Sequence, residues 1–128
     1  MSLLNQVTTH REINPDVTMP PVRMNIQGTD GIGKSTFGAN APDVIFIQAE
    51  DGLSFINAAR FPQANTWEEI LEQVKTLAME EHGYKTVVLD TTDAAAKLGE
   101  ANVCEKNGWS SAADPKAGYG AFYVAEEN

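Results

Sequence analysis

Lysine and serine side chains follow a run of glycines near the start of the chain, in a pattern typical of phosphate binding. Residues 28–36 read Gly-Thr-Asp-Gly-Ile-Gly-Lys-Ser-Thr and match G-x-x-x-x-G-K-[ST]. Because glycine has no Cβ, the backbone can adopt positive φ and wrap around an anion, with successive N–H groups pointing inward. A helix that starts here would add its N-terminal dipole. Lys34 would contact the terminal phosphates, and the Ser35 hydroxyl would bind Mg²⁺.

The surroundings of this run favour a phosphate-binding loop over the alternative, a glycine-rich β-turn with an ordinary surface lysine. An apolar segment, residues 22–27, precedes the glycines as a predicted strand, and a helix over residues 33–40 is predicted to follow. Asp30 is expected to point to solvent, because a carboxylate beside a phosphate would repel it. The predicted phosphate-binding residues are Gly28, Thr29, Asp30, Gly31, Ile32, Gly33, Lys34, Ser35 and Thr36.

Acidic residues follow two apolar, β-branched segments of the chain. Glu50 comes shortly after residues 44–47, and Asp90 directly after residues 87–89. Such runs predict strands of a parallel sheet, whose carboxyl ends share the edge where ligands bind. Phosphoryl transfer to water needs a phosphate clamp, an acid that holds the metal and a base for the water. Asp90 is therefore the candidate for holding the Mg²⁺ hydration shell, and Glu50 is the candidate base. The alternatives are a helix-initiating acid for Asp90 and a solvated turn carboxylate for Glu50.

The clearest predicted helix follows Thr66, which forms a T-x-x-E capping box with Glu69. Its predicted end is near Gly83, as a left-handed C-cap, with His82 as a solvated residue of the last turn. The apolar face at helical spacing consists of Trp67, Ile70, Leu71, Val74, Leu77 and Ala78.

The remaining segments alternate between strand and helix. Residues 84–90 predict a third strand, and residues 94–106 an alanine-rich helix that Asn107 and Gly108 close. Residues 53–60 are ambiguous, with a short helix as one interpretation. The alternation predicts an α/β fold with right-handed crossovers and a parallel sheet flanked by helices.

Composition is that of an ordinary globular protein, with 42% hydrophobic and 21% charged residues in a chain of 128. The formal net charge of −9 disfavours a broad phosphate-binding face. Cys104 is the single cysteine, which excludes an internal disulfide and suits a reducing cytoplasm. We expect no membrane partner, because no apolar run approaches a membrane span and the start lacks a signal-peptide layout. Residues 1–21 are predicted to be an N-terminal arm, and residues 22–128 the core.

Taken together, these segments resemble the RecA-like P-loop ATPases, most closely phage nucleotide-binding proteins of single-strand annealing and recombination. Residues 28–36 resemble the first nucleotide motif of that family, and residues 86–91 the second. Residues 44–53 resemble the strand that delivers the catalytic glutamate, and the match falls on Glu50. Residues 106–109 and 118–120 resemble a segment that follows in the phage proteins.

The resemblance implies a P-loop NTPase fold that binds and hydrolyses ATP with Mg²⁺, with Lys34 and Glu50 catalytic and with Ser35 and Asp90 at the metal. It implies a homo-oligomer, a ring or filament, in the cytoplasm of a bacterial host. Single-stranded DNA would bind a region that contains Lys106, Trp109, Lys116 and Tyr119. A loop packed by Trp109 is the alternative for that region.

The chain departs from the family at its C-terminal side. Family members have a further strand, after the second motif, that lies between the phosphate-loop strand and the Asp90 strand and carries a γ-phosphate sensor. The sequence therefore predicts an incomplete core, with its C-terminal part missing. Two alternatives to an ATPase follow: a non-catalytic nucleotide-binding assembly subunit, and a nucleotide kinase or GTPase on the same fold. The sequence contains no Asn-Lys-x-Asp guanine motif and no arginine-rich lid.

Overall fold

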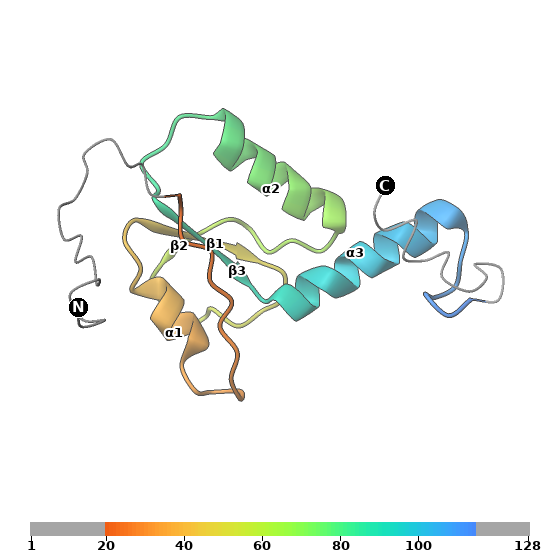
Figure 1. Cartoon of the computed structure of the whole chain (residues 1–128), viewed down its shortest axis with the longest axis horizontal. Helices are drawn as coiled ribbons and strands as arrows, with labels where there is room; N and C mark the ends of the chain where they lie inside the picture. The colour runs from red at the N-terminus through yellow and green to blue at the C-terminus, as the bar shows by residue number, and fades with distance from the viewer. Residues whose placement is uncertain (1–19, 115–128) are drawn as a thin grey trace, which may run out of the picture.

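The computed structural model describes residues 20–114, so most of the predicted N-terminal arm, Lys116 and Tyr119 lie outside the described residues. The elements along the chain are α1 (Lys34–Ala39), β1 (Val44–Gln48), β2 (Ala59–Arg60), α2 (Trp67–Met79), β3 (Thr86–Asp90) and α3 (Thr92–Asn107). Figure 1 shows their arrangement. In this part of the chain no helix is both long and apolar enough to cross a membrane.

The sheet has three parallel strands in the order β2-β1-β3. β1 and β3 pair along their whole length, from Val44 opposite Thr86 to Gln48 opposite Asp90. β1 and β3 are parallel neighbours but do not follow one another in the chain, so a crossover connection must join them. α2 and the loop that precedes it provide this crossover. The predicted α/β class with a parallel sheet is therefore confirmed.

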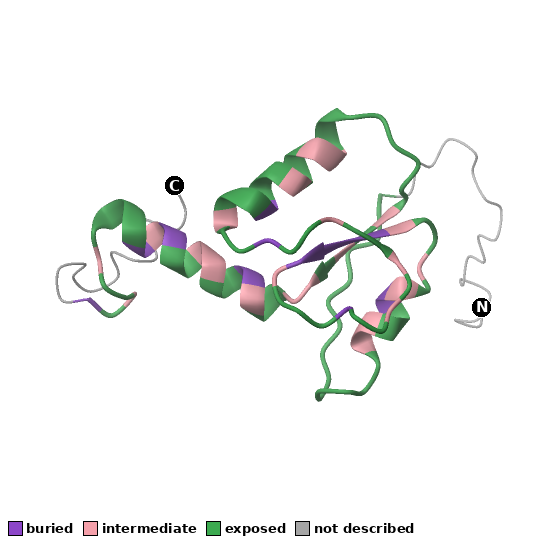
Figure 2. Cartoon of the chain, turned by 180° about the vertical axis from the view of Figure 1, so that it is seen from behind, coloured by how far each residue is buried: buried purple, intermediate pink, exposed green. Residues whose placement is uncertain are grey.

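Helices cover both faces of the sheet (Figure 1). On one face α1 packs against Phe46 and Val88, at the level of its buried residue Gly38. On the other face Ile47 joins a buried cluster with Ala64 of the loop before α2, Ile70 of α2 and Ala95 of α3. β1 is the most deeply buried element of the sheet, as Figure 2 shows, because it is the middle strand and has helices on both sides.

The capping box of α2 is present as predicted. The Thr66 hydroxyl accepts from the Glu69 N–H at 3.2 Å, and the Glu69 carboxylate accepts from the Thr66 N–H at 3.3 Å. The predicted apolar face is only partly used: Trp67, Ile70 and Leu77 pack into the core, whereas Leu71, Val74 and Ala78 are exposed. The sheet is narrow, so α2 has more apolar surface than the sheet can cover.

The predicted left-handed cap at Gly83 is wrong. α2 ends at Met79, Glu80 is already extended, and Gly83 is not among the positive-φ glycines. A left-handed cap does close α3, where Gly108 has φ 68° and its N–H bonds back to the helix.

The predicted strand over residues 22–27 is wrong, because the described part of the chain offers it no neighbouring strand with which to pair. This segment pairs with no strand among residues 20–114, and Val22, Met24 and Ile26 are exposed. A strand exists only with a hydrogen-bonded neighbour, and the resemblance placed a further strand between this segment and β3. The described residues supply no such strand. The short helix over residues 53–60 is also wrong, because these residues form a turn that leads into β2.

Candidate functional site

α1 and β3 bring the two predicted metal-binding residues into contact. The Ser35 hydroxyl donates to a carboxylate oxygen of Asp90, with Oγ to Oδ2 at 2.5 Å. One helical turn further along α1, Gly38 lies against Val88, two residues before Asp90 on β3. Alternate residues of a strand share a face, and residues three apart share a helix face. α1 therefore runs antiparallel to β3, with its N-terminus at the carboxyl end of the strand.

Gly38 sets the spacing between α1 and β3. A Cβ at this position would lie 3.3 Å from both methyl carbons of Val88 and 3.5 Å from the Phe46 ring. This contact is tight, so even a single added carbon would require the Val88 side chain to shift by a few tenths of an ångström. Sequence reasoning gave Gly38 no role, although its position three residues after Ser35 could have indicated a close helix-to-sheet contact.

The loop before α1 has the backbone that the motif requires. Gly31 and Gly33 have φ 76° and 104°, a region that residues with a Cβ rarely adopt. Gly28 lies so close to Ile32 that an added Cβ would stand 2.9 Å from its side chain. A turn bond from the Ile32 N–H to the Thr29 carbonyl, at 3.3 Å, closes the loop. Asp30 is exposed, as expected.

The Lys34 ammonium lies over this loop. Its Nζ donates to the Gly28 carbonyl at 2.6 Å and to the Thr29 carbonyl at 2.9 Å. A bound phosphate would have to compete with these carbonyls for the ammonium protons. Because a phosphate oxygen carries charge and a carbonyl does not, the exchange favours the phosphate.

Glu50 stands at the same sheet edge as Asp90. The preceding residue, Ala49, donates its N–H to the Asp90 carbonyl at 2.9 Å, so the chain leaves β1 beside the end of β3. The Glu50 side chain is exposed. The structure thus brings the loop, Ser35 and Asp90 together and places Glu50 one residue beyond the last backbone bond between the strands.

The oxygen pair of Ser35 and Asp90 fits Mg²⁺, which binds through one or two protein oxygens together with waters and substrate phosphates. Within residues 20–114, no group of three or more His, Cys, Asp or Glu side chains could hold a metal by itself. The Ser35 proton is directed at Asp90, so the hydroxyl lone pairs remain for a cation. Ser35 would bind the ion, and Asp90 would orient the hydroxyl and the ion's water shell.

The described residues proposed for DNA lie elsewhere. Lys106 is exposed in the last turn of α3. Trp109 is half-buried just beyond this helix, and its backbone N–H donates to the Cys104 carbonyl at 2.8 Å. The far end of α3 points away from α1 in both views (Figures 1 and 2). These residues are therefore separate from the phosphate loop, and Trp109 is partly used in packing.

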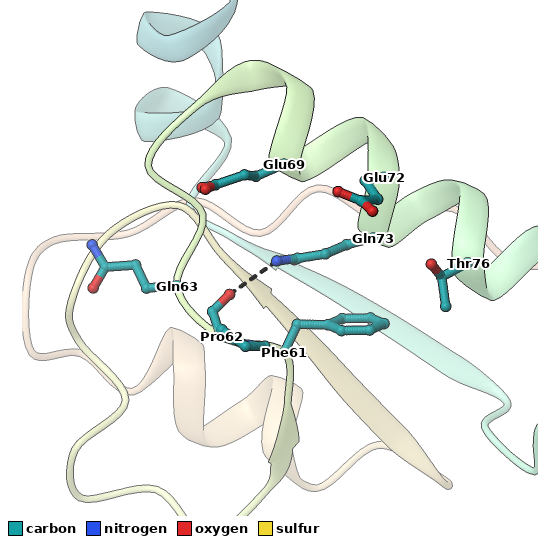
Figure 3. Close-up of a pocket in the computed structure, with 7 residues that line it drawn as sticks. All are labelled: Phe61, Pro62, Gln63, Glu69, Glu72, Gln73 and Thr76. Atoms are coloured by element: carbon teal, nitrogen blue, oxygen red, sulfur yellow. Dashed lines mark hydrogen bonds between the residues drawn. The ribbon is translucent and has the colours of Figure 1, made fainter.

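A hollow of about 290 Å³ lies between α2 and the chain that enters it (Figure 3). Its lining residues are Phe61, Pro62, Gln63, Glu69, Glu72, Gln73 and Thr76. Gln73 donates to the Pro62 carbonyl at 2.9 Å across this hollow, as the dashed line in Figure 3 shows. None of the predicted site residues lines it, so the hollow is distinct from the loop and the two acids.

A glycine-rich loop, a lysine and a serine–aspartate pair at the carboxyl edge of a parallel sheet define a P-loop nucleotide-binding protein. Comparison with protein families agrees, because the model described as an AAA domain matches residues 20–125. The chain belongs to this AAA-type family of P-loop ATPases.

The SPbeta prophage-derived uncharacterized protein YorG of Bacillus subtilis (strain 168) is similar to the chain, with 26% identity over 103 residues. The match covers 77% of this chain but only 32% of YorG, so the chain spans about a third of that relative. No solved structure matches the chain significantly.

Proposed function

We propose that this chain binds Mg·ATP and hydrolyses it in the manner of a RecA-like ATPase of phage recombination or single-strand annealing. The observation that supports this most directly is the hydrogen bond from Ser35 to Asp90, next to the Lys34 loop. It joins the predicted metal-binding side chains of two motifs that are far apart in the sequence.

In this mechanism the loop amides and Lys34 bind the phosphates, and Ser35 and Asp90 hold the metal, which would neutralise charge on the transferred group. Glu50 would orient the attacking water and accept its proton, because it is exposed at the edge where Asp90 ends β3. The prophage origin of YorG supports the phage context. Association into a ring or filament, and contact of Lys106 and Trp109 with single-stranded DNA, are further parts of the proposal.

The test is ATP turnover by the purified chain with Mg²⁺, with and without single-stranded DNA, compared with Lys34→Ala and Glu50→Gln. We expect the parent chain to turn over ATP. Lys34→Ala should lose both this turnover and nucleotide binding. Glu50→Gln should lower turnover by about 100- to 10,000-fold and keep binding. DNA stimulation would support the recombination role.

Two outcomes would contradict parts of this proposal. Turnover no higher than that of Lys34→Ala, with nucleotide binding intact, would exclude hydrolysis by this chain and favour a non-catalytic nucleotide-binding subunit. Phosphate transfer to a nucleotide acceptor, in place of water, would favour a kinase.

A further inference from the structure

Arg60, on the short edge strand β2, is bonded entirely to backbone carbonyls of the loop that follows Glu50. Its Nη1 donates to the Leu53 carbonyl at 2.7 Å and its Nε to the Ala58 carbonyl at 3.4 Å. Its Nη2 donates to the Ile56 carbonyl. No carboxylate pairs with this guanidinium among the described residues. One side chain therefore gathers three carbonyls of residues 53–58.

The same loop is anchored at Leu53 in a second way. The Leu53 side chain is buried with 1% exposure, and its carbonyl also accepts the Ile56 N–H at 3.0 Å. Arg60 itself is fixed by the sheet, because it lies opposite Phe46 in the pairing of β1 with β2. The guanidinium thus ties the loop to the sheet.

Glu50 lies between two fixed points of the backbone. On one side, Ala49 bonds to the Asp90 carbonyl at 2.9 Å; on the other, Leu53 is held by Arg60 and by burial. Only Glu50, Asp51 and Gly52 connect these points, and Gly52 has open space around its Cα. The path of so short a link depends on where both ends are held.

We propose that Arg60 is a positioning residue, which holds the 53–58 loop so that Glu50 points at the nucleotide site. This inference rests on the role of Glu50 in the proposed function. A planar guanidinium can direct several fixed donors at once, whereas an ammonium is a single point with rotatable donors, so lysine replaces it poorly. Displacement of a catalytic group by about 1 Å can cost about 100-fold in rate.

The experiment compares the full chain with Arg60→Ala and Arg60→Lys, and with Lys75→Ala as a charge-matched control. Lys75 is exposed on α2 and makes no hydrogen bond or ion pair in the described part of the chain. We expect kcat to fall about 10- to 100-fold in Arg60→Ala and less in Arg60→Lys. The Kd for Mg·ATP should stay within about threefold, and Lys75→Ala should match the parent.

A double variant separates positioning from other effects. In the Glu50→Gln background, Arg60→Ala should lower the residual turnover no further, because residues that act through one another are non-additive. The inference would be overturned if Arg60→Ala lowered turnover in the Glu50→Gln background by the same factor as in the parent. Unchanged turnover in Arg60→Ala would also overturn it, as would a loss of nucleotide binding in parallel with turnover.

Hydrogen exchange of the amides of residues 50–58 supplies a measurement that does not depend on turnover. We expect at least about tenfold faster exchange in Arg60→Ala, an intermediate rate in Arg60→Lys and no change in Lys75→Ala. Unchanged exchange in the loop would overturn the inference. If the parent has no turnover, hydrolysis fails as the proposed function, and the exchange result still decides whether Arg60 holds the loop. Arg60→Lys keeps both measurements available should Arg60→Ala not fold.

Discussion

Ser35 and Asp90 are 55 positions apart in the sequence and share a hydrogen bond of 2.5 Å. The contact follows from packing that involves neither polar group: Gly38 lies against Val88, and the periodicities of helix and strand then bring Ser35 to Asp90. The proposed metal-binding pair is therefore a product of the apolar contact between α1 and β3.

Asp90→Asn should weaken Mg²⁺-dependent nucleotide binding, because the amide keeps the size of the side chain and removes its charge. Hydrogen bonds to charged groups contribute about 1.5–3 kcal/mol, so we expect a loss of about 10- to 100-fold in affinity for Mg·ATP. Titration with ATP in the presence of Mg²⁺ and of a chelator measures the effect. Asp93→Asn, an exposed carboxylate in the first turn of α3, is the control. An equal loss in the presence of the chelator would contradict a role at the metal.

Gly38→Val should destabilise the fold and weaken nucleotide binding together. The first added carbon already meets Val88 at 3.3 Å, and overpacking of this kind costs about 1–3 kcal/mol. Urea denaturation measures the change in stability. Gly83→Val is the control, since a Cβ there meets nothing within 4 Å and φ is not left-handed; its effect should stay within about 0.5 kcal/mol. A Gly38→Val protein with full stability and full nucleotide affinity would show that the helix can move without consequence.

In its neutral form, the His82 imidazole should carry its proton on Nε2. Nε2 lies 2.8 Å from the Leu77 carbonyl, which can only accept, and Nδ1 accepts the Tyr84 N–H at 3.1 Å. The ring thus closes the C-terminus of α2, where Gly83 was expected to do so. Nitrogen NMR shifts of the imidazole at neutral pH identify the tautomer.

His82→Phe keeps a ring beside Tyr84 and removes both hydrogen bonds, so we expect a loss of about 1–2 kcal/mol in the free energy of unfolding. Equal stability of His82→Phe and the parent would mean that the ring contact, with centroids 5.7 Å apart, is the stabilising part.

The Cys104 thiol should react slowly in the folded protein. Burial raises its pKa above the ordinary value, and the carboxylates of Glu100 and Asp114 raise it further. Since the thiolate is the nucleophile, alkylation by iodoacetamide at neutral pH should be much slower than in urea. This raised pKa contributes stability that is fully present below the ordinary thiol pKa and is lost as pH rises through the folded value. Equal alkylation rates in the folded and unfolded chains would contradict this environment.

Local signals in the sequence were sufficient for the elements whose causes are local. The capping box of Thr66 and Glu69, the apolar strands before Glu50 and Asp90, and the glycine pattern all concern residues within a few positions of one another. Their placement at one sheet edge could be predicted because parallel strands end together.

Features that depend on a distant partner could not be read in this way. Residues 22–27 have the composition of a strand, but a strand also needs a neighbour. β2 consists of Ala59 and Arg60 alone, which is too short to give a periodic signal. The role of Arg60 depends on three backbone carbonyls. Every residue has a backbone carbonyl, so the residue types do not indicate which ones accept from Arg60.

The pairing of Gln48 with Asp90 would make the proposed nucleotide binding a reporter of correct strand alignment. If β3 shifted by one residue along β1, Leu89 would take the place that faces α1, and the Asp90 carboxylate would turn to the opposite side of the sheet. Such a misaligned molecule would keep its helices and most of its buried area, and circular dichroism would scarcely distinguish it. Titration with Mg·ATP would, because the fraction of molecules that bind equals the fraction whose strands are in register.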